Sequence, residues 1–242
     1  MVKEADIIVI GKTVDATSRW ETERSGQVFL YTYVTFEVER YIKGKSAGDV
    51  IVIKHAGGAV EIPIPDEPGV IELPSGFTRE VTEEDIEYYK GLKEKFGDAY
   101  PAFIVGQLRS DSPTFVVGYR ELLFLKRGGT FEGKPVFGVV GAFQGKYTIV
   151  EGKAVVDWGH GLTMEIFILS KRAELGDEGS KRELERRFYD YPKIPKDEVP
   201  SLEELLDRIE EIMSTGVIQT SWGKVKFFRR SLVRHGGKAR GE

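Results

Sequence analysis

The chain has 242 residues, with 40% hydrophobic and 31% charged side chains, which is the balance of an ordinary globular protein with a charge-rich surface. It contains no cysteine, so disulfides, thiolate metal sites and cysteine nucleophiles are excluded. The net charge of −4 argues against a protein whose whole surface binds nucleic acid, because such proteins need a positive field.

Composition also bears on the origin and the compartment of the protein. Asparagine is absent and glutamine is scarce, while Glu, Lys and Arg are abundant, which is typical of thermophiles. No run of about 18 apolar residues occurs, so the sequence predicts no transmembrane helix. The chain enters a strand-like stretch at Ile7 without a signal-peptide pattern. Two locations stay open: the cytoplasm for the chain as written, or the cell surface and exterior for a mature fragment.

Alternating β-branched and aromatic residues predict an early hairpin. A buried strand over 5–15, with a bulge or bend at Gly11, precedes a polar loop over 19–26. A long alternating strand over 27–42 follows the loop. Further strand-like segments come later in the chain, at 49–54, 102–108, 136–143, 146–150, 153–158, 162–169 and 217–228.

Helical patterns are fewer than strand patterns. Thr82 and Asp85 form a capping box at the start of a helix predicted over 82–97. A second, amphipathic helix is predicted over 201–215, where leucine and isoleucine follow helical spacing. The charged residues 171–200 contain three prolines, which indicates a connector on the surface.

Several motifs resemble a known family. They are Ala5–Lys12, Tyr33–Glu39, Ile42–Gly44, Gly118 with Leu122–Leu125, and Gln144–Tyr147. Together they resemble the netrin-like domain, the oligonucleotide/oligosaccharide-binding (OB-type) β-barrel also found in tissue inhibitors of metalloproteinases. They are closer still to uncharacterised prokaryotic proteins, archaeal and thermophilic, that carry the same motifs. The animal inhibitors bind zinc through an N-terminal cysteine, which this chain lacks, so that mechanism does not carry over.

The resemblance implies an α+β fold that is mainly β, with an OB-like antiparallel barrel, closed or partly open, and added helices. We expect the barrel to span 1–170, with an insertion at about 56–113 that has no counterpart in the family. A charged connector and a C-terminal amphipathic helix packed on the barrel are expected over 171–216. A terminal strand and a basic flexible tail are expected over 217–242.

No pattern predicts catalysis. The three histidines, His55, His160 and His235, lack the i, i+4 spacing that places two imidazoles on one helix face for zinc. Nucleophile elbows, phosphate-binding glycine loops and EF-hand loops are absent. We therefore predict a protein that is not an enzyme and has no metal and no cofactor.

Candidate binding residues form three groups, each with aromatic side chains. They are Trp20, Phe29, Tyr31 and Tyr33 on the first hairpin, Trp158 and His160 in a glycine-flanked loop, and Trp222, Lys224, Lys226, Arg229 and Arg230 near the C-terminus. The hairpin aromatics alternate with core-facing residues, and either the insertion covers them or they bind a ligand. The loop is either a ligand contact or an exposed turn. The basic group either binds phosphates or an anionic membrane surface, or it is a solubilising tail.

These observations favour a binding or scaffold module that engages a protein partner. The alternatives are an OB-type nucleic-acid or oligosaccharide binder, with nucleic acid contacted through the basic tail, and a self-assembling structural subunit. In the last case an exposed edge such as 217–228 would add to a neighbour's sheet. The identity of the partner and the oligomeric state stay open.

Overall fold

The structure of the chain is a computed structural model. It describes residues 1–46, 48–63, 65–97, 103–107, 112–156, 164–174, 176–190, 197–220 and 223–226. The chain divides into two compact units, Met1–Leu202 and Glu203–Glu242, and each is described by itself. The α+β class, mainly β with added helices, is confirmed.

The first unit is organised around one seven-stranded sheet. Its strands are β1 (Ile7–Thr22), β2 (Val28–Lys43), β3 (Val50–Ala56), β8 (Arg120–Phe131), β9 (Lys134–Val139), β10 (Lys146–Val150) and β11 (Lys153–Val156). They lie in the order β1-β2-β3-β9-β8-β10-β11, and β1 also pairs with β8. The sheet therefore closes into a ring through β1, β2, β3, β9 and β8, and β10 and β11 extend it beyond β8. The β3–β9 pair is parallel, and the other pairs of this sheet are antiparallel.

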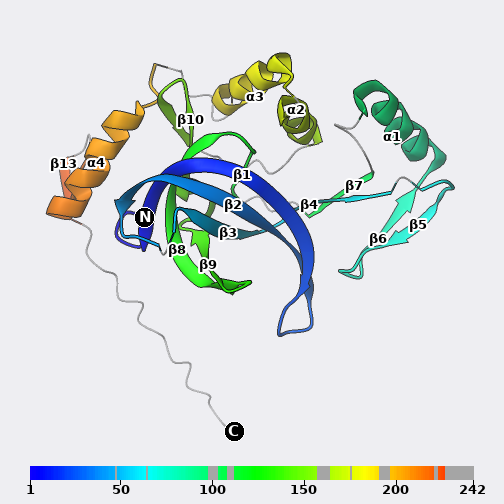
Figure 1. The fold of residues 1–242 in the computed structure, drawn as a ribbon, viewed down its shortest axis with the longest axis horizontal. Helices are drawn as coiled ribbons and strands as arrows, with labels where there is room; N and C mark the ends of the chain where they lie inside the picture. Colours follow the sequence, from blue (N-terminus) through cyan, green and yellow to red (C-terminus); the bar gives the residue numbers. More distant parts are fainter. Residues whose placement is uncertain are drawn as a thin grey trace, which may run out of the picture. The chain divides into compact units, whose positions relative to one another are not determined.

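The strands of the ring bury alternate side chains inside it, as their period of two requires. The inner core combines residues of all five ring strands with one residue of the segment before β8: Ile7, Val9, Val34, Phe36, Val38, Ile51, Ile53, Phe115, Leu123, Leu125 and Phe137. Figure 1 shows β1 and β2 as one long curved hairpin. The bulge expected at Gly11 is confirmed by a register shift there, and a Cβ atom on Gly11 would lie 2.1 Å from the carbonyl oxygen of Glu37.

The β1–β2 hairpin is longer than the sequence predicted. Residues 19–22 were expected in a loop, but β1 runs to Thr22 and the turn is confined to 23–27. The turn closes through a hydrogen bond from the amide of Glu23 to the carbonyl of Gln27 and a glycine with positive φ at Gly26. Cross-strand pairing along the hairpin explains why polar residues continue the strand here.

The insertion between β3 and β8 has a small core of its own. It contains β4 (Gly58–Ile62) paired with β7 (Phe103–Gln107), β5 (Gly69–Glu72) paired with β6 (Thr78–Val81), and α1 (Glu83–Phe96). The helix begins with the predicted capping box of Thr82 and Asp85. Figure 1 shows α1 beside β5 and β6, and Val81, Ile86 and Tyr89 form the buried centre of this cluster.

Two helices form where the sequence predicted a strand and a surface connector. The strand predicted over 162–169 is wrong from Met164 on, because α2 (Met164–Glu174) begins there. A short apolar run fits a buried strand and a helix equally well. The connector predicted over 171–200 contains α3 (Glu178–Asp190), in which Leu184 is the one fully buried apolar residue among the described side chains and most residues are polar. Glu183 pairs with arginines three and four residues later, and such pairs stabilise a polar helix.

A short 3₁₀ turn, η2 (Ala142–Gly145), joins β9 to β10. The second unit contains α4 (Leu202–Thr215), which begins at the last residue of the first unit, and a hairpin of β12 (Val217–Thr220) and β13 (Gly223–Lys226). The predicted helix over 201–215 is confirmed, and Leu206 and Ile209 are its buried residues.

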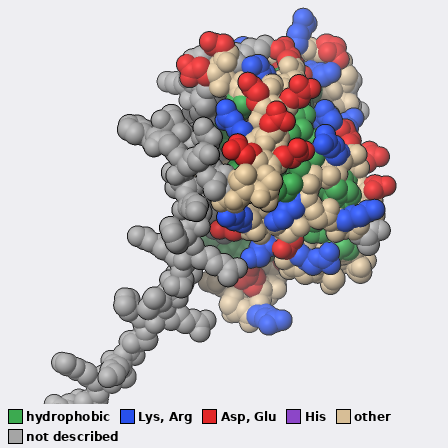
Figure 2. All heavy atoms as spheres, turned by 90° about the vertical axis from the view of Figure 1, so that its left-hand side faces the viewer, with side chains coloured by type: hydrophobic (Ala, Val, Ile, Leu, Met, Phe, Trp, Pro, Cys, Tyr) green, Lys and Arg blue, Asp and Glu red, His purple; other side chains and the backbone are tan. Residues whose placement is uncertain are grey.

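The charges of the protein are mixed rather than segregated on the face shown in Figure 2. There, acidic and basic side chains lie interspersed among the coloured atoms, and hydrophobic side chains show between them. None of the helices in the described part of the chain is long and apolar enough to cross a membrane.

Candidate functional site

The outer face of the ring carries a cluster of charged and aromatic side chains. Because side chains alternate along each strand, the neighbours of the core residues point outward. The pairing register places Arg19 opposite Tyr31 and Lys54 opposite Tyr33 on adjacent strands. Phe131, the last residue of β8, packs against the ring of Tyr33. We call the set Arg19, Glu21, Tyr31, Tyr33, Lys54 and Phe131 the outer-face cluster.

The carboxylate of Glu21 joins the polar groups of the cluster. Lys54 Nζ lies 2.6 Å from Oε2, and Arg19 Nη2 lies 2.8 Å from Oε1. The hydroxyl of Tyr33 donates to Oε1 at 2.5 Å. Burial alone would raise the pKa of Glu21, but the hydrogen bonds from Lys54, Tyr33 and Arg19 outweigh it and lower the pKa to about 2. The carboxylate is therefore charged at neutral pH and holds both cations in place.

The same two cations lie over the aromatic rings. The guanidinium carbon of Arg19 is 4.5 Å from the ring centroid of Tyr33 and 4.3 Å from that of Phe131. Lys54 Nζ is 3.9 Å from the centroid of Tyr31. The Tyr33 and Phe131 rings are 4.3 Å apart, and Tyr31 donates its hydroxyl hydrogen to Glu23. Cation–π contacts and the shared carboxylate thus hold the cluster in one arrangement.

The cluster presents its cations to solvent more than its rings. The Arg19 side chain is 45% exposed and that of Lys54 29%, whereas Tyr33 is only 9% exposed. Tyr31 and Phe131 are half-buried. A ligand on this face would meet charged and polar edges above an aromatic floor.

The structure separates the hairpin aromatics that the sequence grouped together. Trp20 pairs with Leu30, on the other face of the hairpin, and packs into the core of the insertion. Tyr31 and Tyr33 belong to the outer-face cluster, and half-buried Phe29 lies opposite Glu21. The insertion therefore covers Trp20, while Tyr31 and Tyr33 pack against side chains of neighbouring strands.

The other candidate residues are only partly described. Lys224 and Lys226 belong to β13. The candidates Trp158, His160, Trp222, Arg229 and Arg230 lie outside the described residues. Their proposed binding roles remain predictions.

A buried ion pair lies inside the sheet, and the sequence analysis missed it. Lys146 Nζ is 2.9 Å from Oε1 of Glu121, and each side chain is 1% exposed. Thr13 donates to Glu121 Oε2 at 2.9 Å, and Lys146 donates to the hydroxyl of Thr148 at 2.8 Å. Register explains the arrangement, because Thr148 lies opposite Glu121 and Lys146 lies opposite Leu123, a residue of the inner core. The available signal was a glutamate next to the apolar run Leu122–Leu125.

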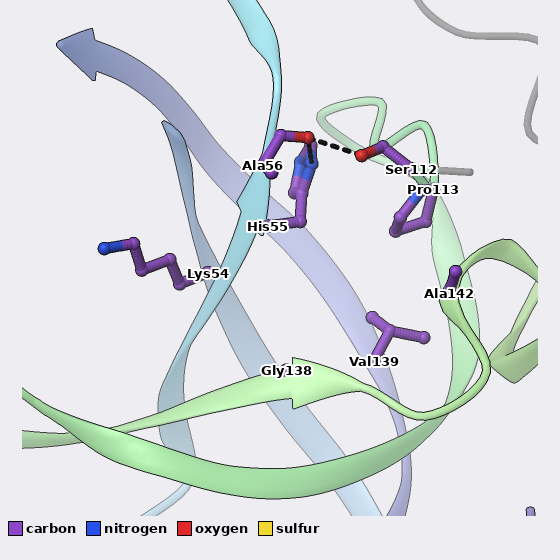
Figure 3. A pocket seen from close by; sticks show the side chains of 8 residues that line it. All are labelled: Lys54, His55, Ala56, Ser112, Pro113, Gly138, Val139 and Ala142. Atoms are coloured by element: carbon purple, nitrogen blue, oxygen red, sulfur yellow. Dashed lines mark hydrogen bonds between the residues drawn. The ribbon is translucent and has the colours of Figure 1, made fainter. Parts of the chain in front are cut away.

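A cavity of about 250 Å³ lies at one end of the ring (Figure 3). Its polar side chains turn toward the backbone: His55 Nδ1 is 3.3 Å from the Ala56 carbonyl oxygen, which also accepts the hydroxyl hydrogen of Ser112. The imidazole of His55 stacks on Phe115 with 5.4 Å between ring centroids, while Lys54 points away from the cavity. On its other side Phe115 lies 5.4 Å from Lys146 Nζ. His55 therefore contacts the backbone and an aromatic ring of the chain itself.

Within the part of the chain that the structure describes, no group of three or more His, Asp or Glu side chains could hold a metal ion. Comparison with family models, with curated proteins and with solved structures found no match. The resemblance to netrin-like domains therefore stays a prediction, and the function has to be argued from the geometry of the chain itself.

Proposed function

We propose that this chain is an OB-type binding module that docks a protein partner on its outer-face cluster. The OB-type assignment is supported by strand order, since five strands close a ring in the order β1-β2-β3-β9-β8. OB barrels bind ligands on the face of their second and third strands, between the loops after the first and fourth strands. In the ring, β8 and β9 are fourth and fifth in chain order, so the equivalent loops are those at 23–27 and 132–133.

The outer-face cluster occupies that region. Tyr31 and Tyr33 come from β2, Lys54 comes from β3, and Phe131 is the last residue before the β8–β9 turn. The observation that carries the proposal is this set of tyrosine and arginine side chains, which hydrogen bonds and an ion pair with Glu21 hold in place. Tyrosine and arginine are enriched among residues that dominate binding between proteins, and pre-organised side chains lose less entropy on binding.

A protein ligand fits the cluster better than nucleic acid does. Bases stack on open aromatic faces, but Arg19 and Phe131 already cover Tyr33, and Lys54 covers Tyr31. The positive charges of Arg19 and Lys54 are balanced locally by Glu21 and by Glu23, which accepts the hydroxyl hydrogen of Tyr31. With Glu23 included the charges cancel, and covered rings without a net positive charge offer little attraction for a phosphate backbone.

The test is capture of a partner by the immobilised full chain from nuclease-treated lysate and surface extract of the source organism, followed by mass spectrometry. Lys54→Glu and Tyr31→Ala alter the cluster, and Lys126→Glu makes the same charge change at an exposed position of β8 as a control. We expect a defined protein to be captured by the wild type and the control and lost with both cluster variants. With the purified partner, calorimetry should show at least about tenfold weaker binding for each cluster variant.

Two results would overturn this proposal. One is equal capture by all four chains, which would place the contact elsewhere on the surface. The other is binding of labelled single-stranded oligonucleotides or oligosaccharides that weakens with Tyr31→Ala, which would show that the cluster receives bases or sugars. Circular dichroism of each variant establishes that the fold is retained.

A further inference from the structure

The distal half of β1 is an open strand edge. β1 pairs with β8 as far as Lys12, and from Asp15 to Thr22 it continues in regular register with β2 alone. The turn hydrogen bond from Glu23 to Gln27 sets the alternation, so the odd-numbered residues direct their amide and carbonyl groups to β2. The backbone groups of Ala16, Ser18 and Trp20 therefore point outward, and in the described part of the chain they have no backbone partner.

This edge carries charged side chains of both signs, Asp15, Arg19 and Glu21, but neither proline nor lysine. Natural edges are protected by charged side chains, above all lysine, by proline, by bulges or by a covering segment. The bulge in this half of β1 lies between Thr13 and Asp15, before the regular part begins, and no proline or lysine follows before the turn. Asp15, Ala16 and Thr17 are exposed. The described part of the insertion contacts the hairpin through a side chain of this strand, since Ala59 donates its amide hydrogen to the hydroxyl of Ser18.

We propose that a second copy of this chain docks on this edge, in an antiparallel pairing centred on Thr17. In that register Ala16 and Ser18 exchange backbone hydrogen bonds with Ser18 and Ala16 of the second copy. Asp15 then lies directly opposite Arg19 of the second copy, and two-fold symmetry repeats the contact. All these charged residues are odd-numbered, so they lie on the same face of the extended sheet.

Charge favours this register over its neighbours. A pairing centred on Ser18 places Asp15 opposite Glu21, and one centred on Arg19 places the two guanidinium groups opposite each other; both are repulsive. A pairing centred on Ala16 places Asp15 opposite Thr17 and forms no ion pair, whereas the pairing centred on Thr17 forms two. The Arg19 guanidinium binds Glu21 through Nε and Nη2 and also interacts with the hydroxyl of Tyr33, and the side chain is still 45% exposed, so the aspartate of the second copy can reach it. The side chain of Asp15 is exposed, and its one contact within the described chain is the hydroxyl of Thr17 at 3.1 Å.

The pairing joins the two β1–β2 hairpins into one sheet. A two-fold axis perpendicular to that sheet leaves the outer-face clusters of both copies on the same side. The dimer therefore presents two binding surfaces in one plane, although the pairing itself depends on the strand edge and not on the proposed partner.

Sedimentation equilibrium of the full chain at about 1 to 100 µM tests the proposal, because this range detects dissociation constants that correspond to about 5–8 kcal/mol of binding free energy. We expect the wild type to approach twice the chain mass at the upper end. Asp15→Arg should weaken the dimer at least about tenfold, since two attractive pairs become repulsive at once. The double variant Asp15→Arg/Arg19→Asp should restore it, because the exchanged charges face each other again. Glu67→Arg, at an exposed position of the insertion, is the matched charge control.

A proline variant tests the backbone part of the pairing. The amide of Ala16 points away from β2, so Ala16→Pro removes an outward donor and leaves the hairpin ladder intact. We expect a folded monomer, with the thermal unfolding midpoint that the wild type has at dilutions where it is monomeric. A wild-type chain that stays monomeric over the whole range overturns the inference, as do an Asp15→Arg chain that dimerises like the wild type and a double variant that is not rescued. Lys54→Glu should leave the dimer mass measured by sedimentation equilibrium unchanged. Loss of partner binding and loss of the dimer are therefore distinguishable.

Discussion

Replacing Lys146 by methionine should destabilise the protein strongly. Lys146 and Glu121 are each 1% exposed and their charged atoms are 2.9 Å apart. At an effective dielectric constant of about 20, unit charges about 3 Å apart attract each other by about 5–6 kcal/mol, and desolvation of both ions offsets that attraction. In the Lys146→Met chain the charge of Glu121 is still buried at a cost in free energy, but the attraction to Lys146 that offsets this cost is lost.

The expected loss is about 3–5 kcal/mol, the usual result of removing one partner from a buried ion pair. Thr13 would still donate a hydrogen bond to the carboxylate. A domain of this size loses about 2–4 °C in midpoint for each kcal/mol, so the midpoint should fall by about 6–20 °C. Urea unfolding followed by circular dichroism measures the free energy, and an unchanged slope confirms the same transition.

The double variant Glu121→Leu/Lys146→Met is the control. It removes both charges with little change in volume, and buried ion pairs replaced in this way are often as stable as the original. We expect it to be more stable than Lys146→Met, with a coupling free energy of about 2 kcal/mol or more. Additive losses in the double variant, or a loss below about 1 kcal/mol in Lys146→Met, would refute the claim that the two charges depend on each other.

Three further predictions follow from the described contacts. Glu21 has a folded pKa of about 2 against 4.5 for the free side chain, so its contribution to stability is complete above pH 4.5 and disappears as pH falls toward 2. Glu21→Gln should lose about 1–2 kcal/mol at pH 7 and less at pH 2, measured by urea unfolding across that range; a constant difference would contradict the assignment. Gly145→Ala should cost more than about 2 kcal/mol, because the new Cβ atom would lie 2.0 Å from the Val140 carbonyl oxygen, whereas Gly69→Ala has open space and should cost under about 0.5 kcal/mol in the same assay. Trp20→Ala should loosen the core of the insertion, which hydrogen exchange would report as faster exchange in α1 and β6 with little change in β8; unchanged exchange in α1 would show that Trp20 does not support it.

Local sequence patterns correctly predicted those strands and helices whose alternation, spacing or capping residues lie within the element itself. The alternation in 27–42 indicated both the strand and the buried face of Val34 and Phe36. The capping box at Thr82 and the apolar spacing after Ser201 located two helices to within a residue or two. In α3 the same reasoning failed, because Leu184 is the one fully buried apolar residue among the described side chains of that helix, and a period cannot be read from one position.

The candidate sites depend on contacts between segments far apart in the chain. Glu121 and Lys146 were both visible, but only the register of β8 with β10 showed that their charges meet inside the sheet. Trp20 and Tyr31 seemed alike in sequence, yet the hairpin register places them on opposite faces.

The sequence by itself determined the α+β class, the first hairpin with its inner face, the helices at 82–97 and 201–215, and the absence of cysteine chemistry. Tertiary structure decided the closure of the ring through β1 and β8, the parallel β3–β9 pair, the outer-face cluster and the buried ion pair. The physical reason is that secondary structure follows from neighbours a few residues apart, whereas strand order and side-chain clusters depend on pairings between segments separated by tens of residues to more than a hundred residues.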